Sequence, residues 1–126
     1  MAPTKFKKAF YIKLGRGGAW EADAIGTGKL RFGWPDQKLA DINGGHWGVI
    51  EDQLRGAIDT AGAATQSLHG LQIITQSTPD DLWITFHQGK LWWTRLGSSP
   101  VAQDGVSKFR RTIQPWSDRS IKNRLL

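Results

Sequence analysis

The chain has 126 residues, a formal net charge of +6, seven tryptophans and no cysteine. This length suits one domain with a single hydrophobic core, and the absence of cysteine excludes disulfides and thiolate metal sites. The sequence has no signal-peptide pattern and no apolar run near the ~20 residues that a membrane-spanning helix needs. We therefore expect a single domain over residues 1–126, located in the cytoplasm.

The positive charge is concentrated at the two ends of the chain. Residues 1–16 contain five basic residues and no acid, residues 108–126 contain six basic residues and one acid, and residues 17–105 are net acidic. If the two ends form neighbouring strands, they would make a basic edge suited to a polyanion. The alternative is that the basic ends only keep a small domain soluble.

The first third of the chain predicts a strand, a short helix and a second strand. Residues 6–14 alternate apolar and polar side chains and stop at a glycine-rich turn, which indicates a strand. Residues 20–25 predict a helical turn that ends at Gly26 or Gly28. Residues 29–34 predict a strand that ends at Pro35, and Gly33 would permit a close approach of backbone beside Trp34.

Two helices are predicted after the turn at residues 43–45. The first spans residues 47–61, with apolar residues three and four apart, and the second spans residues 64–75. The predicted buried face of the second helix consists of Ala64, Leu68, Leu71 and Ile74.

Residues 80–96 predict a β-hairpin closed by Gln88 and Gly89. A two-residue turn places Phe86 opposite Leu91, Ile84 opposite Trp93 and Leu82 opposite Arg95, and this face is expected to pack on the core. The other face carries Trp83, Thr85, His87, Lys90, Trp92 and Thr94. Either another element covers its two tryptophans or they form a recognition surface.

The end of the chain predicts a loop over residues 97–105 and a basic strand over residues 106–113. In that strand Phe109 and Arg111 alternate with Lys108 and Arg110. A chain that closes on two leucines suggests either the N-terminal domain of a longer protein or an end that packs on the core.

No catalytic centre is predicted. The three histidines are far apart in sequence and lack the paired spacing of a metal site. Asp80 and Asp81 precede a strand, but the next strand begins at Lys90 without the second carboxylate that a metal-dependent nuclease needs. We expect a protein that is not an enzyme and that has no cofactor and no metal, with a small nuclease or hydrolase as a rival interpretation.

The remaining pattern is that of a binding protein. Tryptophans beside glycines and acids, together with basic segments, suit a protein that stacks one unpaired base between rings and contacts the flanking phosphates. Asp23 could accept a hydrogen bond from the base, and His87 is a second candidate for its edge. The phosphate-binding candidates are Arg31, Lys90, Arg95, Lys108, Arg110 and Arg111. The alternative is that the tryptophans belong to the core.

The order of elements resembles the PUA-like superfamily, and within it the EVE and YTH-type domains. The opening FYIKL, the later LRFGW, the hairpin DLWITFHQGKLWW and the final KFRRTIQPWSD carry this resemblance. It implies an α+β fold, a small β-barrel of about five to six strands flanked by two to three helices. It also implies that the domain flips a modified base into an aromatic cage.

By this resemblance Trp34 is the first cage residue, and Trp20 and Trp47 are the candidates for the second ring. Related domains direct modification-dependent restriction systems, which implies modified DNA in preference to RNA and a fused or associated nuclease domain. The alternatives are an RNA-binding module and a protein-interaction domain that uses an exposed tryptophan face.

Overall fold

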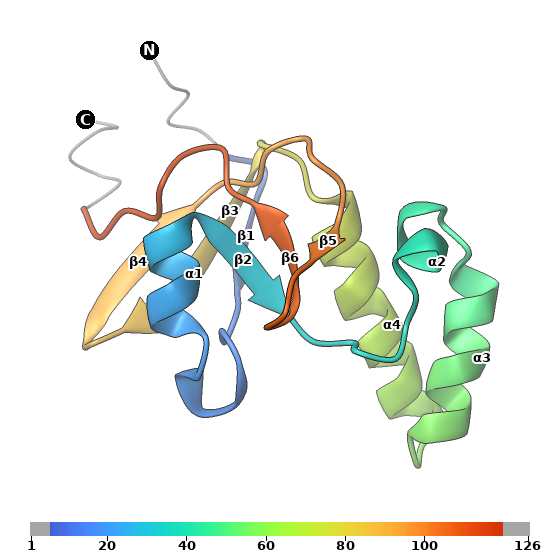
Figure 1. Ribbon diagram of the computed structural model, residues 1–126. Helices are drawn as coiled ribbons and strands as arrows, with labels where there is room; N and C mark the ends of the chain where they lie inside the picture. Colours follow the sequence, from blue (N-terminus) through green and yellow to red (C-terminus); the bar gives the residue numbers. More distant parts are fainter. Residues whose placement is uncertain (1–5, 120–126) are drawn as a thin grey trace.

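The computed structural model describes residues 6–119 and has the α+β composition that the sequence predicted. Its strands are β1 (Lys8–Tyr11), β2 (Lys29–Phe32), β3 (Asp81–His87), β4 (Lys90–Thr94), β5 (Ala102–Gln103) and β6 (Lys108–Arg111). Its helices are the 3₁₀ helix η1 (Arg16–Gly18) and the α-helices α1 (Glu21–Thr27), α2 (Leu39–Asn43), α3 (Trp47–Ala57) and α4 (Ala61–Gln76). Figure 1 shows α2, α3 and α4 together at one end, with α1 near the β3–β4 hairpin at the other.

The strands form two three-stranded sheets, ordered β1-β3-β4 and β2-β6-β5. Two isolated antiparallel bridges, Trp93 with Ser117 and Leu96 with Thr112, join β4 and the residues after it to the segment that follows β6. Residues 6–119 form no closed barrel, so the predicted PUA-like barrel is not confirmed. The basic N-terminal strand and the basic strand β6 lie in different sheets, so the two ends do not form neighbouring strands as the sequence suggested.

The predicted hairpin is confirmed, including its register. Phe86 pairs with Leu91 and Ile84 pairs with Trp93 across β3 and β4. The turn residues Gln88 and Gly89 have φ values of 53° and 73°, which is the pattern of a type I′ turn. This turn matches the right-handed twist of the two strands and therefore fixes the register.

The two faces of the hairpin are only partly as predicted. Near the turn, the supposed core face is exposed, since Phe86 is 54% and Leu91 42% accessible. The opposite face packs inward, with Trp83 in the hydrophobic core and its indole N–H bonded to the Ser77 hydroxyl. A core on this side covers both tryptophans, because Trp92 also packs against it.

The predicted helices are present and their apolar stripes point into the core, but the one predicted over residues 47–61 ends at Ala57, and Ala61 begins α4. The buried residues of α4 are Ala64, Leu68, Leu71 and Ile74, the face that the sequence predicted. α3 buries Ile50 and Leu54 against the same core. α1 ends at Gly28 with φ of 69°, the left-handed conformation that glycine tolerates best.

Some elements were missed or lie elsewhere. α2 and β5 were not predicted, because both are short and carry no clear apolar period. A Cβ at Gly33 would meet no atom within 4 Å, so the predicted close approach of backbone at this glycine is wrong. The suggestion about the C-terminal leucines lies outside the described residues.

Strand β6 carries a buried guanidinium that links three parts of the fold. Arg110 donates to the carbonyl oxygens of Ile74 and Ser77 at the end of α4, at 3.1 and 2.6 Å. It also donates to those of Gly97 and Ser99, at 2.5 and 3.3 Å, in the loop after β4. Burial lowers the pKa of Arg110 from its ordinary value. The side chain therefore joins strand, helix and loop from inside the protein.

We expect Arg110→Met to lower the free energy of unfolding by about 2–4 kcal/mol, since buried carbonyls left without donors each cost ~1–3 kcal/mol. Its exposed neighbour is the matched control, and Arg111→Met should change the free energy by less than about 0.5 kcal/mol. Urea denaturation gives the free energy of unfolding of both variants and of the wild type. Equal stability of the two variants would contradict the structural role of Arg110.

Candidate functional site

The structure does not bring the three candidate tryptophans into one cage. Trp20 precedes α1, Trp34 follows β2 and Trp47 begins α3. Within residues 6–119 no aromatic ring contact joins any two of them. The ring contact of Trp34 is with Phe32, edge to face at 6.0 Å between centroids. Neither Trp20 nor Trp47 lines the pocket beside Trp34, so the structure gives no support to a cage of these three rings.

Trp34 itself is held firmly in an unusual conformation. Its φ is 56°, although a bulky residue rarely adopts positive φ. Its indole N–H donates to the hydroxyl of Ser67 on α4 at 2.9 Å, and the buried ammonium of Lys108 donates to its carbonyl oxygen at 2.6 Å. The far edge of the indole packs beside Gly70 of α4, 3.6 Å from where a Cβ would stand, which is an ordinary van der Waals distance. Backbone strain that the surroundings enforce in this way is concentrated at functional sites.

An open pocket of about 360 Å³ lies against Trp34. Its residues come from the segment after β2 and from the two long helices, namely Gly33, Trp34, Pro35, Asp36, Gln37, Leu54, Ala57 and Ser67. The volume is near the lower end of the range for small-molecule sites, about 300–1,000 Å³. The pocket thus combines one large aromatic ring and two aliphatic side chains with a carboxylate and an amide.

Gln37 is a polar group of this pocket that is available to a ligand. The residue is only 6% exposed, and its side-chain amide makes no hydrogen bond to any described residue. The amide keeps access to solvent, because Thr85 Oγ1 is the one fully buried side-chain polar atom without a partner among the described residues. An amide presents one donor group and one acceptor to a ligand, and the exposed Asp36 beside it presents acceptors only.

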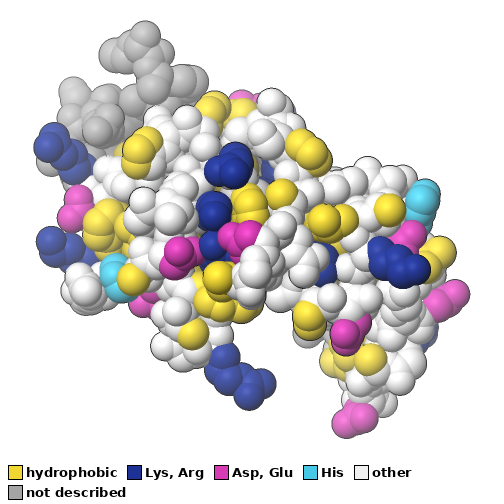
Figure 2. Space-filling view, viewed as in Figure 1, with side chains coloured by type: hydrophobic (Ala, Val, Ile, Leu, Met, Phe, Trp, Pro, Cys, Tyr) yellow, Lys and Arg dark blue, Asp and Glu magenta, His cyan; other side chains and the backbone are white. Residues whose placement is uncertain are grey.

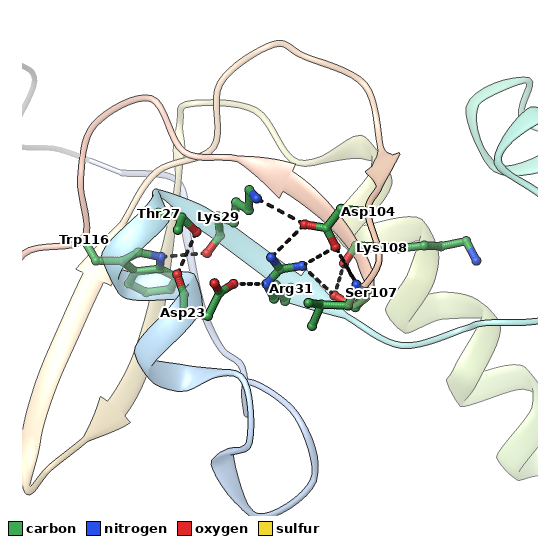
Figure 3. A network of polar contacts seen from close by, with 9 residues as sticks. Asp23, Thr27, Lys29, Arg31, Asp104, Ser107, Lys108 and Trp116 are labelled. Atoms are coloured by element: carbon green, nitrogen blue, oxygen red, sulfur yellow. Dashed lines mark hydrogen bonds and ion pairs between the residues drawn. The ribbon is translucent and has the colours of Figure 1, made fainter.

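Asp23 lies away from this pocket, in an ionic network around β2 that Figure 3 shows. Its carboxylate accepts from Arg31 Nε at 2.5 Å, and Asp104 accepts from both terminal nitrogens of Arg31, at 2.9 and 2.8 Å. Lys29 adds a bond to Asp104 at 3.1 Å. Asp23 is thus engaged with Arg31 and is not one of the residues that line the Trp34 pocket.

This network changes the acid–base behaviour of two of its members. The Arg31 guanidinium, helped by the backbone N–H groups of Val106 and Ser107, holds the pKa of Asp104 well below its usual range. In turn, the bond to Asp104 raises the pKa of Arg31 against the lowering effect of burial.

Most of the predicted phosphate-binding side chains are buried and already bonded inside the protein. Arg31, Arg95, Lys108 and Arg110 are buried. Arg95 donates to the carbonyl oxygen of Pro79, and burial lowers the pKa of Lys108, whose ammonium bonds the carbonyls after β2. Lys90 and Arg111 are exposed, and Lys90 lies 3.5 Å from Asp118. Only these two of the six remain open to a phosphate in this structure.

His87 is also engaged elsewhere. Its Nδ1 lies 2.8 Å from Oε1 of Glu21 on α1, and its ring contacts Trp92. His87 does not line the Trp34 pocket, so the sequence-based suggestion that it touches the same base has no geometric support.

The sequence singled out Trp34 but missed its partners in the pocket. Asp36 and Gln37 follow it in the segment FGWPDQ, so proximity in sequence was an available signal for both. Ser67, Leu54 and Ala57 come from helices that only the tertiary structure brings to Trp34.

Residues 6–119 contain no group of three or more His, Cys, Asp or Glu side chains placed to bind a metal ion. The described helices also include none that is long and apolar enough to cross a membrane. Comparisons with protein-family models, curated proteins and solved structures gave no match. The interpretation of the site therefore depends on its own chemistry.

We expect the ionic network to make stability fall in acid. A carboxyl whose pKa is lowered by folding stabilises the folded state above its unfolded pKa, about 4, and this contribution is lost as the pH falls below it. Urea unfolding at pH 6 and pH 3 should show a smaller loss of stability for Asp104→Asn than for the wild type. Asp59→Asn, at an exposed position without an ion pair among the described residues, should keep the wild-type loss. Identical pH dependence of wild type and Asp104→Asn would contradict the assignment.

Proposed function

We propose that this chain binds nucleic acid and holds one unstacked, modified base against the ring of Trp34. The observation that carries the proposal is the pocket beside this fixed ring, with the amide of Gln37 in its lining and not bonded to any described residue. Base stacking on one aromatic side chain contributes about 1–3 kcal/mol. Leu54 and Ala57 line the same pocket and offer the apolar contact that a second ring would otherwise give.

The polar side of the pocket suits a base with an exocyclic amino group. Asp36 can accept from such a group, and Gln37 can donate to a neighbouring ring nitrogen while its oxygen accepts. Derivatives of cytosine and adenine have this arrangement. We propose modified DNA as the polymer, with the domain directing a fused or associated nuclease to the modified site.

The electrostatics predict few phosphate contacts near this pocket. Residues 33–76 contain five acidic and two basic residues, and Figure 2 shows acidic side chains spread over the helical end. Lys38, exposed and next to Gln37, is the closest basic residue along the chain. With one or two phosphates neutralised, log K should fall with log salt with a slope of about −1 to −2. In this proposal, contacts with the base contribute more of the binding free energy than contacts with phosphates do.

The first test compares Trp34→Ala with Trp20→Ala. Fluorescence anisotropy would measure the binding of labelled duplexes that are unmodified or carry methylated cytosine, hydroxymethylated cytosine or methylated adenine, with matching RNA strands. We expect one modified duplex to bind best and Trp34→Ala to weaken it by about tenfold or more, from lost stacking. Trp20→Ala, which lies outside the pocket, should keep the preference.

Thermal unfolding shows whether both tryptophan variants are folded. A folded Trp34→Ala protein that keeps the full preference would contradict the proposal. Equal binding of all duplexes by the wild type would also contradict it, and a preference for RNA would move the proposal to that polymer.

The second test addresses the base edge. Gln37→Leu keeps the size of the side chain but removes its donor and acceptor, so the preferred duplex should lose about tenfold in affinity while the unmodified duplex changes little. Gln76→Leu, at an exposed position at the end of α4, is the matched control and should bind as the wild type. A Gln37→Leu protein with wild-type selectivity would exclude the amide as a reader of the base.

A further inference from the structure

The sheet β1-β3-β4 has an apolar outer face that no described element covers near the hairpin turn. Tyr11 on β1, Phe86 on β3 and Leu91 on β4 are 61%, 54% and 42% exposed. The register puts them on one face, because Tyr11 pairs with Ile84, which lies two residues before Phe86, and Phe86 pairs with Leu91. The rings of Tyr11 and Phe86 are in contact, with centroids 6.0 Å apart. Clustered apolar side chains on a surface mark interaction sites more often than single ones.

The same face ends at a strand edge with which no strand of residues 6–119 pairs. Among the described strands, β1 is the outer one of its sheet and pairs with β3 on one side only. Its neighbouring residues also bond to the β3 side, as when Ile12 N–H donates to the Ile84 carbonyl at 2.9 Å. An edge strand presents a row of free N–H and C=O groups, which is a template for another extended chain.

The charge of this edge is positive, and only part of it is paired with acids. Residues 6–16 contain Lys7, Lys8, Lys13 and Arg16 and no acid. Lys7 makes a long, exposed ion pair with Asp80 at 3.8 Å, whereas Lys8, Lys13 and Arg16 have no ion-pair partner among the described residues. Two copies of β1 side by side would bring like charges together, which disfavours self-association through this edge.

We propose that β1 docks an acidic, extended peptide of a partner protein, which adds a strand to the sheet and places an apolar side chain on Tyr11, whose ring is supported by Phe86 on the neighbouring strand. The free edge supplies backbone hydrogen bonds, the lysines attract the acidic side chains, and the exposed rings supply apolar contact. Nucleic acid would use the charge and the rings but would leave the backbone edge unused. This surface is separate from the Trp34 pocket, because none of its residues lines that pocket.

The test uses a fluorescein-labelled decapeptide of alternating glutamate and valine, measured by anisotropy with the whole chain. We expect saturable binding that weakens at least tenfold in the double variant Tyr11→Ser, Phe86→Ser. The matched control is Val106→Ser, Ile113→Ser, which removes two apolar side chains of similar exposure, 52% and 55%, elsewhere. The control should bind as the wild type.

Two further ligands separate the possible occupants. Two glutamate–valine peptides carry N-methyl groups, one on every odd residue and the other on every even residue. An N-methylated residue cannot donate a backbone hydrogen bond to β1, so at least one of the two peptides should lose binding. This experiment uses the wild-type protein and does not depend on the folding of a variant. The proposal would be overturned if the parent peptide did not bind, if both N-methylated peptides bound as tightly as the parent, or if the folded double variant bound the parent as the wild type does. Competition by a single-stranded oligonucleotide at the same side chains, without peptide binding, would assign the surface to nucleic acid.

Discussion

Burial of positive charge on β6 is the constraint on which the rest of this structure depends. Lys108 and Arg110 lie on a strand between two others, and both side chains are buried. A buried cation is costly unless hydrogen bonds satisfy it, and here the partners are backbone carbonyls. These carbonyls come from the end of α4, from the loop after β4 and from the segment after β2. The hydrogen bonds of Lys108 and Arg110 thus determine how the helices α2, α3 and α4 are joined to the two sheets.

The candidate site is a consequence of the same bonds. The Lys108 ammonium holds the carbonyl of Trp34, and Ser67 holds its indole, so ring and backbone are fixed from two sides. A residue with positive φ before a proline would relax without such support. The cation that the sequence suggested for phosphate binding therefore positions the ring that we propose for base binding.

The sequence predicted what depends on short-range pattern. The hairpin, its register and the buried face of α4 follow from alternation, turn residues and helical spacing, and all three are confirmed. The outer side of the hairpin was assigned to the core because Phe86 and Leu91 are apolar, but which face of a sheet is covered depends on elements distant in sequence. Trp34 was identified through a resemblance, and its pocket needs Leu54 and Ser67 from two helices.

The basic residues show most clearly which features could not be predicted from the sequence. A run such as KFRR is normally solvated, and its alternation gives no sign that carbonyls from distant loops will meet two of its charges. Trp20, Trp34 and Trp47 likewise belong to different elements, and neither Trp20 nor Trp47 lines the pocket beside Trp34. The burial of the cations on β6 and the positions of the tryptophans both depend on contacts between segments that are distant in sequence.

The central claim is that a modified base stacks on Trp34, and the indole N–H resonances test it directly. Each of the seven tryptophans has one indole N–H group, and the ¹H–¹⁵N signal that disappears in Trp34→Phe is assigned to Trp34. Titration with the preferred modified duplex should shift the Trp34 signal saturably, while the unmodified duplex should leave it in place. A Trp34 signal that stays fixed while another indole shifts would contradict the claim.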